Sequence, residues 1–379
     1  MKIIFAPDSF KGTIRSPEVC NILQKAFQEE LPGAQYVCLP MADGGEGTVE
    51  AVLAAGKGER RQITVKDPLG RPVQAEFAFL PETAQAVIEM ASASGLELLD
   101  KTELNPLLTS TFGTGQLLLE AQRLGAREII IGIGGSATVD GGAGMARALG
   151  CRLFDADGQE LPEGGGALRQ LATLDLSGLA QWNRQIKVRV ACDVTNPLTG
   201  PAGATAVFAP QKGATPEMLP ILEAGLQNWG NILIKLGLIA DTSQPGDGAA
   251  GGLGAGLRAL LGARMESGAR LIAELVGLEE HLSGASLLIT GEGCTDEQTC
   301  FGKLPAVVAE LANSAGVPAI LLSGAVKGSQ NPLREKFQAI FSTLSEVAPL
   351  DKTLAAAREN LYNCARAVAA TLRIANCGK

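Results

Sequence analysis

The stretch EIIIGIGGSATVDGGAG, residues 128–144, sets an apolar, strand-like run directly before a cluster of glycines and one aspartate. Glycine–acid clusters recur as DGGEGT (43–48), DGAAGGLGAG (247–256) and TGEGCTDEQ (290–298), and three of the four clusters follow strand-like runs. Glycine lets a backbone turn tightly and present amide groups to an anion. Carboxylates among such amides suit Mg²⁺ that bridges to phosphate, or a hydroxyl that must be oriented. The pattern predicts an enzyme with a phosphorylated ligand.

Strand-like and helical segments alternate along the chain, which is typical of an α/β protein with mostly parallel sheet. The chain opens with a strand at 2–7, and Ser16-Pro17 then marks a helix start. Between 60 and 90, short runs around the turn sequence DPLGRP predict antiparallel strands and hence another domain. We expect a discontinuous Rossmann-like domain from residues 1–59 and 285–379, with residues 60–284 inserted as a second, mixed α/β domain.

The amino-acid composition limits the kinds of partner that the protein can bind. The 379 residues carry a net charge of −8, which provides no global field for nucleic acid, and no apolar stretch reaches membrane-spanning length. The apolar start is too short for a signal peptide, so we expect a cytoplasmic protein without membrane or nucleic-acid partners. The eight cysteines form no CxxC pair and predict reduced thiols. The single histidine, His281, leaves carboxylates as the main candidates for a general base.

Charged residues at strand ends are the candidate site residues. Because loops at the carboxyl end of a parallel strand form the ligand crevice, Asp8 could hold a metal or hydroxyl and Lys11 could neutralise phosphate. Asp43 is a hard oxygen ligand for Mg²⁺, and Asp193 could accept a substrate proton. For each of these residues an ordinary turn or solvated loop is the alternative reading.

Other polar residues have the same two readings. Lys212, between a glutamine and a glycine in PQKGA, could contact phosphate or lie exposed in a loop. Ser136 could donate to a carboxylate or phosphate, or bond within its turn. Arg71 could clamp a carboxylate with two hydrogen bonds, or face water in a hairpin.

A dinucleotide-binding motif is an alternative. GIGGSA (132–137) follows a strand, and Asp155 lies about twenty residues on, as an NAD fingerprint requires. Asp140 and the following glycine pair interrupt the helix start where a pyrophosphate would bind. A second match at 246–251 follows no strand, and no Walker A sequence occurs. An NAD-dependent oxidoreductase therefore stays open as the competing hypothesis.

Taken in order, the motifs resemble bacterial glycerate kinases of the type I family. They span nearly the whole chain and read APDSFKG, PMADGGEGT, DPLGRPV, VIEMASASGLELL, STFGTGQLL, IIIGIGGSAT, DGGAGM, ACDVTNPLTG, PQKGA, GAAGGLGAGL, ITGEG and FGKLP. The resemblance implies ATP-dependent phosphorylation of D-glycerate with Mg²⁺, 2-phosphoglycerate being a more usual product than 3-phosphoglycerate among bacterial relatives. It also implies a two-domain α/β architecture with a cleft between the domains.

Positions that match the motifs are the candidate site residues, and their individual roles are assigned from chemistry. The catalytic candidates are Asp193 as proton acceptor with Lys11 and Lys212 on phosphate; those for substrate are Asp8, Ser9, Arg71, Ser136 and Asp140; those for nucleotide are Gly44, Gly45, Glu46, Gly134, Gly135, Gly291 and Glu292; and those for magnesium are Asp43 and Asp296. We expect Lys11, Asp43, Asp193 and Asp296 to converge on one gap between the domains.

Three positions depart from the family pattern. Cys294 stands where the family usually has an arginine after GEG, Val139 replaces an asparagine before Asp140, and Ala209 replaces a glycine before PQKGA. Loss of an arginine removes a forked cation that could bind carboxylate or phosphate. A related kinase with another hydroxy-acid substrate, or a binding protein without turnover, is therefore an alternative to a glycerate kinase.

Overall fold

The computed structural model describes residues 1–296, 299 and 302–377. Its contacts divide the chain into two compact units. The terminal unit comprises Met1–Asp43, Glu50–Lys57 and Ser267–Lys379, and the inserted unit comprises Gly44–Val49 and Gly58–Glu266. Each unit has its own sheet and its own hydrophobic core.

The terminal unit is built on a five-stranded sheet in which every neighbouring pair is parallel. The strand order is β13-β12-β11-β1-β2. The strands are β1 (Lys2–Phe5), β2 (Gln35–Cys38), β11 (Leu287–Thr295), β12 (Ala319–Val326) and β13 (Ala339–Ser342). The sheet thus joins the two ends of the chain, and the predicted Rossmann-like parallel domain is confirmed.

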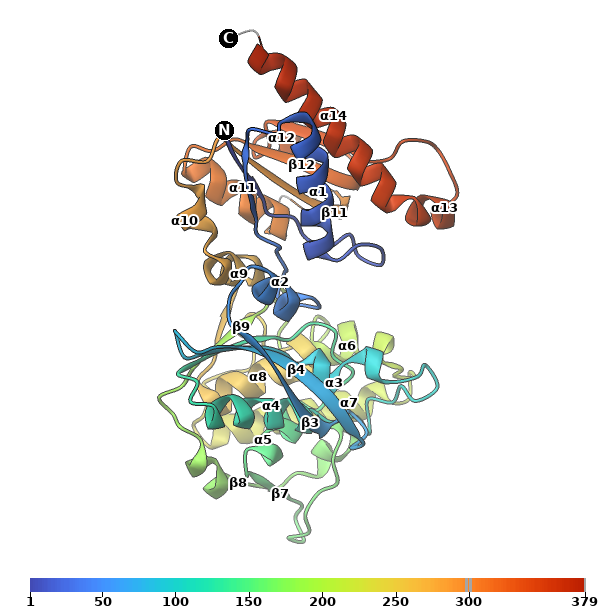
Figure 1. Cartoon of the computed structure of the whole chain (residues 1–379). Coiled ribbons are helices and arrows are strands. Elements are labelled where there is room, and N and C mark those ends of the chain that lie inside the picture. Colours follow the sequence, from blue (N-terminus) through green and yellow to red (C-terminus); the bar gives the residue numbers. More distant parts are fainter. Residues whose placement is uncertain (297–298, 300–301, 378–379) are drawn as a thin grey trace. The chain divides into compact units, whose positions relative to one another are not determined.

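Helices pack on this sheet and on one another, several of them through buried apolar faces. Its helices outside the α2 region are α1 (Ser16–Glu30), α9 (Gly268–Val276), α10 (Leu278–Leu282), α11 (Leu304–Ser314), α12 (Asn331–Arg334), α13 (Leu350–Ala355) and α14 (Ala357–Cys377). The predicted start of α1 is correct, with Pro17 in its first turn. In Figure 1, α14 lies along α1, and Leu361, Ala365 and Phe27 enter the same core.

The inserted unit contains a six-stranded mixed sheet in the order β10-β9-β6-β5-β4-β3. Its strands are β3 (Glu59–Lys66), β4 (Pro72–Leu80), β5 (Gln85–Glu89), β6 (Glu128–Gly132), β9 (Lys187–Ala191) and β10 (Arg264–Glu266). Strands β3, β4 and β5 pair antiparallel, as the run of short strands between 60 and 90 predicts. Strands β5, β6, β9 and β10 are parallel and bring their carboxyl ends to one edge.

Helices and a small two-stranded sheet complete the inserted unit. They are α3 (Ala91–Ser94), α4 (Phe112–Arg123), α5 (Ala143–Ala148), α6 (Ala204–Phe208), α7 (Leu219–Lys235), α8 (Ala249–Leu261) and the antiparallel pair β7 (Arg152–Phe154) and β8 (Thr173–Asp175). A single helix, α2 (Thr48–Ala54), is divided between the units. The core of the inserted unit includes Trp229, whose indole N–H donates to the Gly141 carbonyl oxygen at 2.9 Å.

The contact-based units differ from the boundaries predicted at 59/60 and 284/285 by two residues at the first boundary, where the inserted unit begins at Gly58, and by more in two other places. Helices α9 and α10 group with the terminal unit because they pack against α11. Residues 44–49 group with the inserted unit because they pack onto its strand ends, as described below. Among the described residues, no helix combines the length and the apolar character needed to cross a membrane.

Candidate active site

Asp8 lies just beyond the carboxyl end of β1. The segment after β1 continues along β11, because Ala6 N–H donates to Ile289 O at 2.8 Å and Asp8 N–H donates to Gly291 O at 2.9 Å. The Asp8 side chain is only 8% exposed, and its Oδ1 accepts a hydrogen bond from Ser9 N–H at 2.6 Å. Burial, together with the negative charge of Asp43, raises the pKa of Asp8 to about 7.

Lys11 and Asp43 meet beside Asp8, although 32 positions separate them in the sequence. Lys11 Nζ lies 3.1 Å from Asp43 Oδ2, and the Lys11 side chain is 75% exposed. The Asp43 carboxylate is the main cause that raises the pKa of Lys11. Met41 N–H donates to Pro7 O at 3.0 Å and so ties the two strand-end segments together. The structure therefore brings three predicted site residues into one cluster.

Glu292 reaches this cluster from β11. The sequence analysis places it in a glycine–acid cluster that follows a strand-like run, whereas β11 continues through it to Thr295, because its pairing with β12 persists to Val326. Glu292 Oε1 accepts hydrogen bonds from Thr295 Oγ1 and Thr299 Oγ1, both at 2.9 Å. Burial raises the pKa of Glu292, and its charge in turn helps to raise that of Asp8. Gly291 lies within the same strand, where its carbonyl holds Asp8.

Asp296 follows β11 and pairs with a lysine. Lys303 Nζ donates to Asp296 Oδ1 at 3.0 Å, and both side chains are partly exposed. The sequence analysis missed Lys303, Thr295 and Thr299. The two threonines stand in or directly after the quoted cluster TGEGCTDEQ, so their hydroxyls were the available signal.

The terminal unit's carboxylates suit a divalent cation. The charges of Asp43 and Glu292 both act on Asp8, and Lys11 supplies a compensating positive charge nearby. A cation would relieve the repulsion that raises the pKa of Asp8. Across residues 1–296, 299 and 302–377, no three or more histidine, cysteine or acidic side chains form a ready metal cage. Mg²⁺ ordinarily needs only one or two carboxylates when nucleotide phosphates and water supply its other ligands.

A second group of predicted residues lies at the carboxyl edge of the inserted unit's parallel strands. The segment 44–49 crosses this edge in close contact with it: a Cβ on Gly132 would lie 2.0 Å from Gly44 O, and one on Gly44 would lie 2.3 Å from Ala191 Cβ. Gly45 approaches Gly134 in the same way. Only glycine permits backbone contact this close. Glu46 lies exposed on this segment.

The turn after β6 exposes backbone and buries side chains. Gly134 and Gly135 are exposed, whereas Ser136 and the residues up to Asp140 are buried. Lys212 Nζ donates to Ser136 Oγ at 2.6 Å and to Thr138 O at 2.7 Å. The Lys212 side chain is 2% exposed, and desolvation lowers its pKa to about 7. Lys212 is thus not an exposed loop lysine.

Asp140 is wholly buried. Its Oδ2 accepts hydrogen bonds from Thr111 N–H and Thr111 Oγ1, both at 2.8 Å, and from Gly144 N–H at 3.0 Å. Its Oδ1 accepts from Gly142 N–H at 3.1 Å. Four protein donors therefore surround the carboxylate, and this arrangement favours a role in holding the loop over direct substrate contact. Thr111, which sequence analysis missed, carries two of these donors.

Asp193 lies two positions beyond the end of β9 and is exposed at the same edge. Exposure leaves its carboxylate accessible to a ligand, and its role as proton acceptor stays a prediction. Glu89 ends strand β5, which β6 separates from β9, and its Oε1 accepts a hydrogen bond from Val49 N–H at 2.7 Å in the first turn of α2. The sequence analysis did not single out Glu89. Its position at a strand end was the signal.

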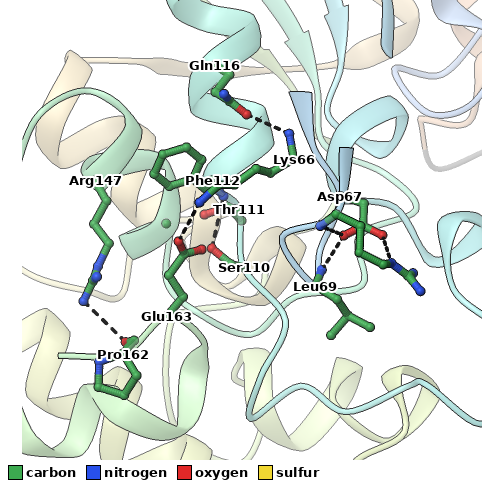
Figure 2. Close-up of polar contacts among 12 residues, drawn as sticks. Lys66, Asp67, Leu69, Ser110, Thr111, Phe112, Gln116, Arg147, Pro162 and Glu163 are labelled. Carbon is green, nitrogen blue, oxygen red and sulfur yellow. Dashed lines mark hydrogen bonds and ion pairs between the residues drawn. The ribbon is translucent and has the colours of Figure 1, made fainter. Parts of the chain in front are cut away.

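Arg71 is engaged by protein carboxylates. Asp67, in the turn between β3 and β4, accepts a hydrogen bond from Leu69 N–H at 2.8 Å (Figure 2). The Asp67 carboxylate also accepts from Arg71 Nε at 2.6 Å, and Arg71 Nη1 donates to Glu103 at 2.6 Å. The guanidinium thus holds a hairpin turn through two protein carboxylates, a contact that neither reading from the sequence includes. A substrate-clamping role for Arg71 stays an untested prediction.

The structure argues against the dinucleotide-binding alternative. After β6 no helix begins until Ala143, and Gly142 before it has a φ of 83°. A pyrophosphate site needs a helix N-terminus directly after the glycine turn. Asp155 accepts hydrogen bonds from Asp157 N–H at 3.0 Å and Gln159 N–H at 2.8 Å in a turn after β7, so it caps that turn.

The three departures from the family pattern lie in different environments. Val139 and Ala209 are fully buried and fill the core of the inserted unit. Cys294 is exposed on β11, opposite Ala325 of β12. The residues that replace asparagine and glycine are thus packing residues, whereas the one that replaces arginine faces solvent.

Two sets of residues at strand ends, one rich in carboxylates and one in glycine, define an α/β enzyme equipped for phosphoryl-group chemistry. Comparison with known proteins identifies the family. The model of the Glycerate kinase family matches residues 3–373, and the chain belongs to this family.

Individual proteins that are similar over nearly the whole chain support this family assignment. Glycerate 2-kinase of Escherichia coli K12 is 45% identical, covering 99% of this chain and 98% of its own. Glycerate kinase of Bacillus subtilis 168 is 46% identical, with the same coverage of both chains. A crystal structure from Salmonella typhimurium LT2, described as a candidate glycerate kinase 2, superposes with a TM-score of 0.89 at 43% identity and covers 99% of each chain.

Proposed function

We propose that this chain is an ATP-dependent kinase that phosphorylates a hydroxyl of D-glycerate, with 2-phosphoglycerate as product, in small organic-acid catabolism. Family membership supports the substrate, and a relative that is a glycerate 2-kinase supports the position. The single observation that carries the chemistry is the cluster of Asp8, Lys11 and Asp43 at the strand ends of the terminal unit. Kinases need charge neutralisation and positioning there more than covalent catalysis.

The residues of the terminal unit would organise the phosphoryl donor. Asp43 and Asp296 are the proposed magnesium ligands, and the bound Mg²⁺ would neutralise charge on the transferred phosphoryl group. Lys11, which is exposed and paired with Asp43, can place its positive charge beside a phosphate oxygen. Glu292 and Gly291 hold the strand-end geometry beside Asp8, whose carboxyl can bind a hydroxyl or a metal-bound water.

The residues of the inserted unit would bind and activate the acceptor. The exposed turn at Gly134 and Gly135 offers backbone amides to an anionic oxygen, and Ser136 adds a hydroxyl at its base. Asp193 is exposed at the same edge and is the proposed acceptor of the substrate's hydroxyl proton. Gly44 and Gly45 let the segment 44–49, which carries Glu46, cross close to the strand ends.

A coupled assay of ADP release tests the function. Purified protein with Mg²⁺, ATP and D-glycerate should release ADP in a glycerate-dependent manner, and L-glycerate and other C3 and C4 hydroxy-acids define the selectivity. We expect Asp43→Asn and Asp193→Asn each to lower kcat by at least about a hundredfold, the scale of a general-base or charge-stabilising group. Absence of glycerate-dependent ADP release from folded protein would refute the specific substrate.

A related kinase with another hydroxy-acid is the second candidate, and exposed Cys294 in place of the family's usual arginine favours it. If that arginine matters for glycerate, Cys294→Arg should lower KM for D-glycerate, and Cys294→Leu should not. Equal KM values for both variants and for the parent protein would show that this position does not select the substrate. A cytoplasmic location stays a prediction from the sequence, and cell fractionation tests it.

A further inference from the structure

The buried ammonium group of Lys212 has a specific partner in Ser136. These residues lie 76 positions apart, and Lys212 projects from the turn at Pro210–Lys212, which a glycine with a φ of 90° closes. The Nζ atom donates to Ser136 Oγ at 2.6 Å and to Thr138 O at 2.7 Å. Burying a lysine is unfavourable unless hydrogen bonds or an opposite charge compensate for the lost water, so the partners of this ammonium group matter.

These contacts determine what the Ser136 hydroxyl can do. A hydroxyl has one hydrogen to donate and lone pairs to accept with. Because Lys212 donates to Ser136 Oγ, the serine's own hydrogen must point elsewhere, and within the described part of the chain no acceptor takes it. Ser136 is 6% exposed and directly follows the exposed pair Gly134 and Gly135, so this hydrogen lies beside the accessible turn.

Backbone hydrogen bonds also hold the rest of this loop. Leu96 N–H donates to Gly135 O at 2.9 Å, Ala137 N–H donates to Ser94 O at 2.9 Å, and Thr109 Oγ1 donates to Ala137 O at 2.9 Å. These bonds hold Ser136 from both sides. The orientation of its hydroxyl is then the main freedom left, and the direction of the Lys212 hydrogen bond sets it.

We propose that Lys212 is a positioning residue that fixes Ser136 as a hydrogen-bond donor to an anionic oxygen of the substrate bound at the Gly134–Gly135 turn. This inference rests on the proposed function and refines it, since Lys212 acts through Ser136 and does not itself contact phosphate. The oxygen belongs either to the carboxylate of the hydroxy-acid or to a phosphate of the nucleotide. Both are strong acceptors of a hydroxyl hydrogen.

The proposal has a consequence for pH. A neutral lysine has a lone pair, so it can accept the Ser136 hydrogen that the ammonium form leaves available to the ligand. The lowered pKa of Lys212, about 7, places this reversal near neutral pH. Asp140 is the group whose charge acts on Lys212, and its four hydrogen bonds from protein donors fix its position.

Calorimetric titration measures the effect without turnover. The dissociation constants of D-glycerate and of ATP are determined from pH 6 to 9 for the unaltered protein, Ser136→Ala, Lys212→Met and the double variant. For one of the ligands, the unaltered protein should bind about tenfold or more weakly at pH 9 than at pH 6, because one hydrogen bond to a charged group is lost. The ligand that responds identifies the oxygen.

The variants separate a positioning role from a structural one. Ser136→Ala should bind that ligand about tenfold or more weakly at pH 6 and lose the extra pH dependence, and subtracting its pH profile removes the ligand's own titration. Lys212→Met should behave alike, and the double variant should bind no more weakly than the weaker single variant. Lys235→Met, at an exposed lysine in the last turn of α7, is the matched control.

Three results would overturn the proposal: an unchanged pH profile in Ser136→Ala, multiplicative effects in the double variant, or no pH effect on either ligand. If Lys212→Met does not fold, the Ser136→Ala profile decides alone. Failure of the proposed function is a different result, because it is an absence of glycerate-dependent ADP release while the binding data stay interpretable.

Discussion

At the scale of single residues, Asp8 combines burial with a nearby like charge. Its pKa is raised to about 7, so the folded protein holds a proton that the unfolded chain, with an ordinary aspartate pKa of 3.8, has already released. The associated stability is fully present below pH 3.8 and is lost as the pH rises to 7. A charged, buried Asp8 is therefore unfavourable for folding at the pH where an enzyme of this kind works.

We accordingly expect Asp8→Asn to raise the free energy of unfolding at pH 8 by about 1–4 kcal/mol in metal-free buffer, since a shift of one pKa unit is about 1.4 kcal/mol. The gain should shrink at pH 5, and ADP release should fall sharply. Urea denaturation at both pH values measures the change in the free energy of unfolding, and the coupled assay measures ADP release. The matched control is Asp157→Asn at an exposed loop position, and a gain of equal size at pH 5 and pH 8 would contradict the explanation.

Lys11 illustrates the opposite case of an exposed charge. Its pair with Asp43 lies largely in solvent, and exposed pairs of this kind contribute about 0.2–1 kcal/mol. Lys11→Met should therefore leave the melting temperature nearly unchanged but lower kcat/KM for ATP by about a hundredfold, the effect of removing one group that stabilises transition-state charge. Lys57→Met, an exposed lysine at the end of a segment of the same unit, serves as control, and equal kinetics in both variants would exclude Lys11 from the site.

At the scale of elements, strand ends were predictable because their signal is local. Apolar runs mark β1, β2, β6 and β9; glycine–acid clusters follow β2 and β6, and an aspartate follows β1 and β9. The contacts between distant segments were not predictable, since nothing near Asp140 in the sequence indicates Thr111, and nothing near Ser136 indicates Lys212. The extension of β11 escaped prediction for the same reason, because only its pairing with β12 sustains it.

The crossing segment 44–49 gives a prediction at this scale. A Cβ on Gly132 would lie 2.0 Å from Gly44 O, so Gly132→Ala must push this segment away from the end of β6. We expect a stability loss of about 1–3 kcal/mol, typical of overpacking, and a larger relative loss of kcat. Gly33→Ala, where an added Cβ meets no atom within 4 Å, is the control. Full activity of Gly132→Ala would show that the position of the segment is unimportant.

At the scale of the whole molecule, the architecture was predictable from alternation and from the family resemblance. The two chain ends share one parallel sheet, and the antiparallel strands belong to an inserted unit. The limits of the units were harder to predict, because α9 and α10 group with the terminal unit through packing on α11, a contact that no local pattern encodes. The convergence of Asp193 and Asp296 with Lys11 and Asp43 remains a prediction. The kinetics of single and double substitutions at these four residues would test it.

The most direct test of the account is phosphorus NMR of a reaction that contains the protein, D-glycerate, ATP and Mg²⁺. We predict a new phosphate monoester signal that appears with ADP and is split into a doublet, because a phosphate on carbon 2 couples to a single proton. A triplet would place the phosphate on carbon 3 and correct the regiochemistry. No glycerate-dependent monoester signal from folded protein would contradict the account.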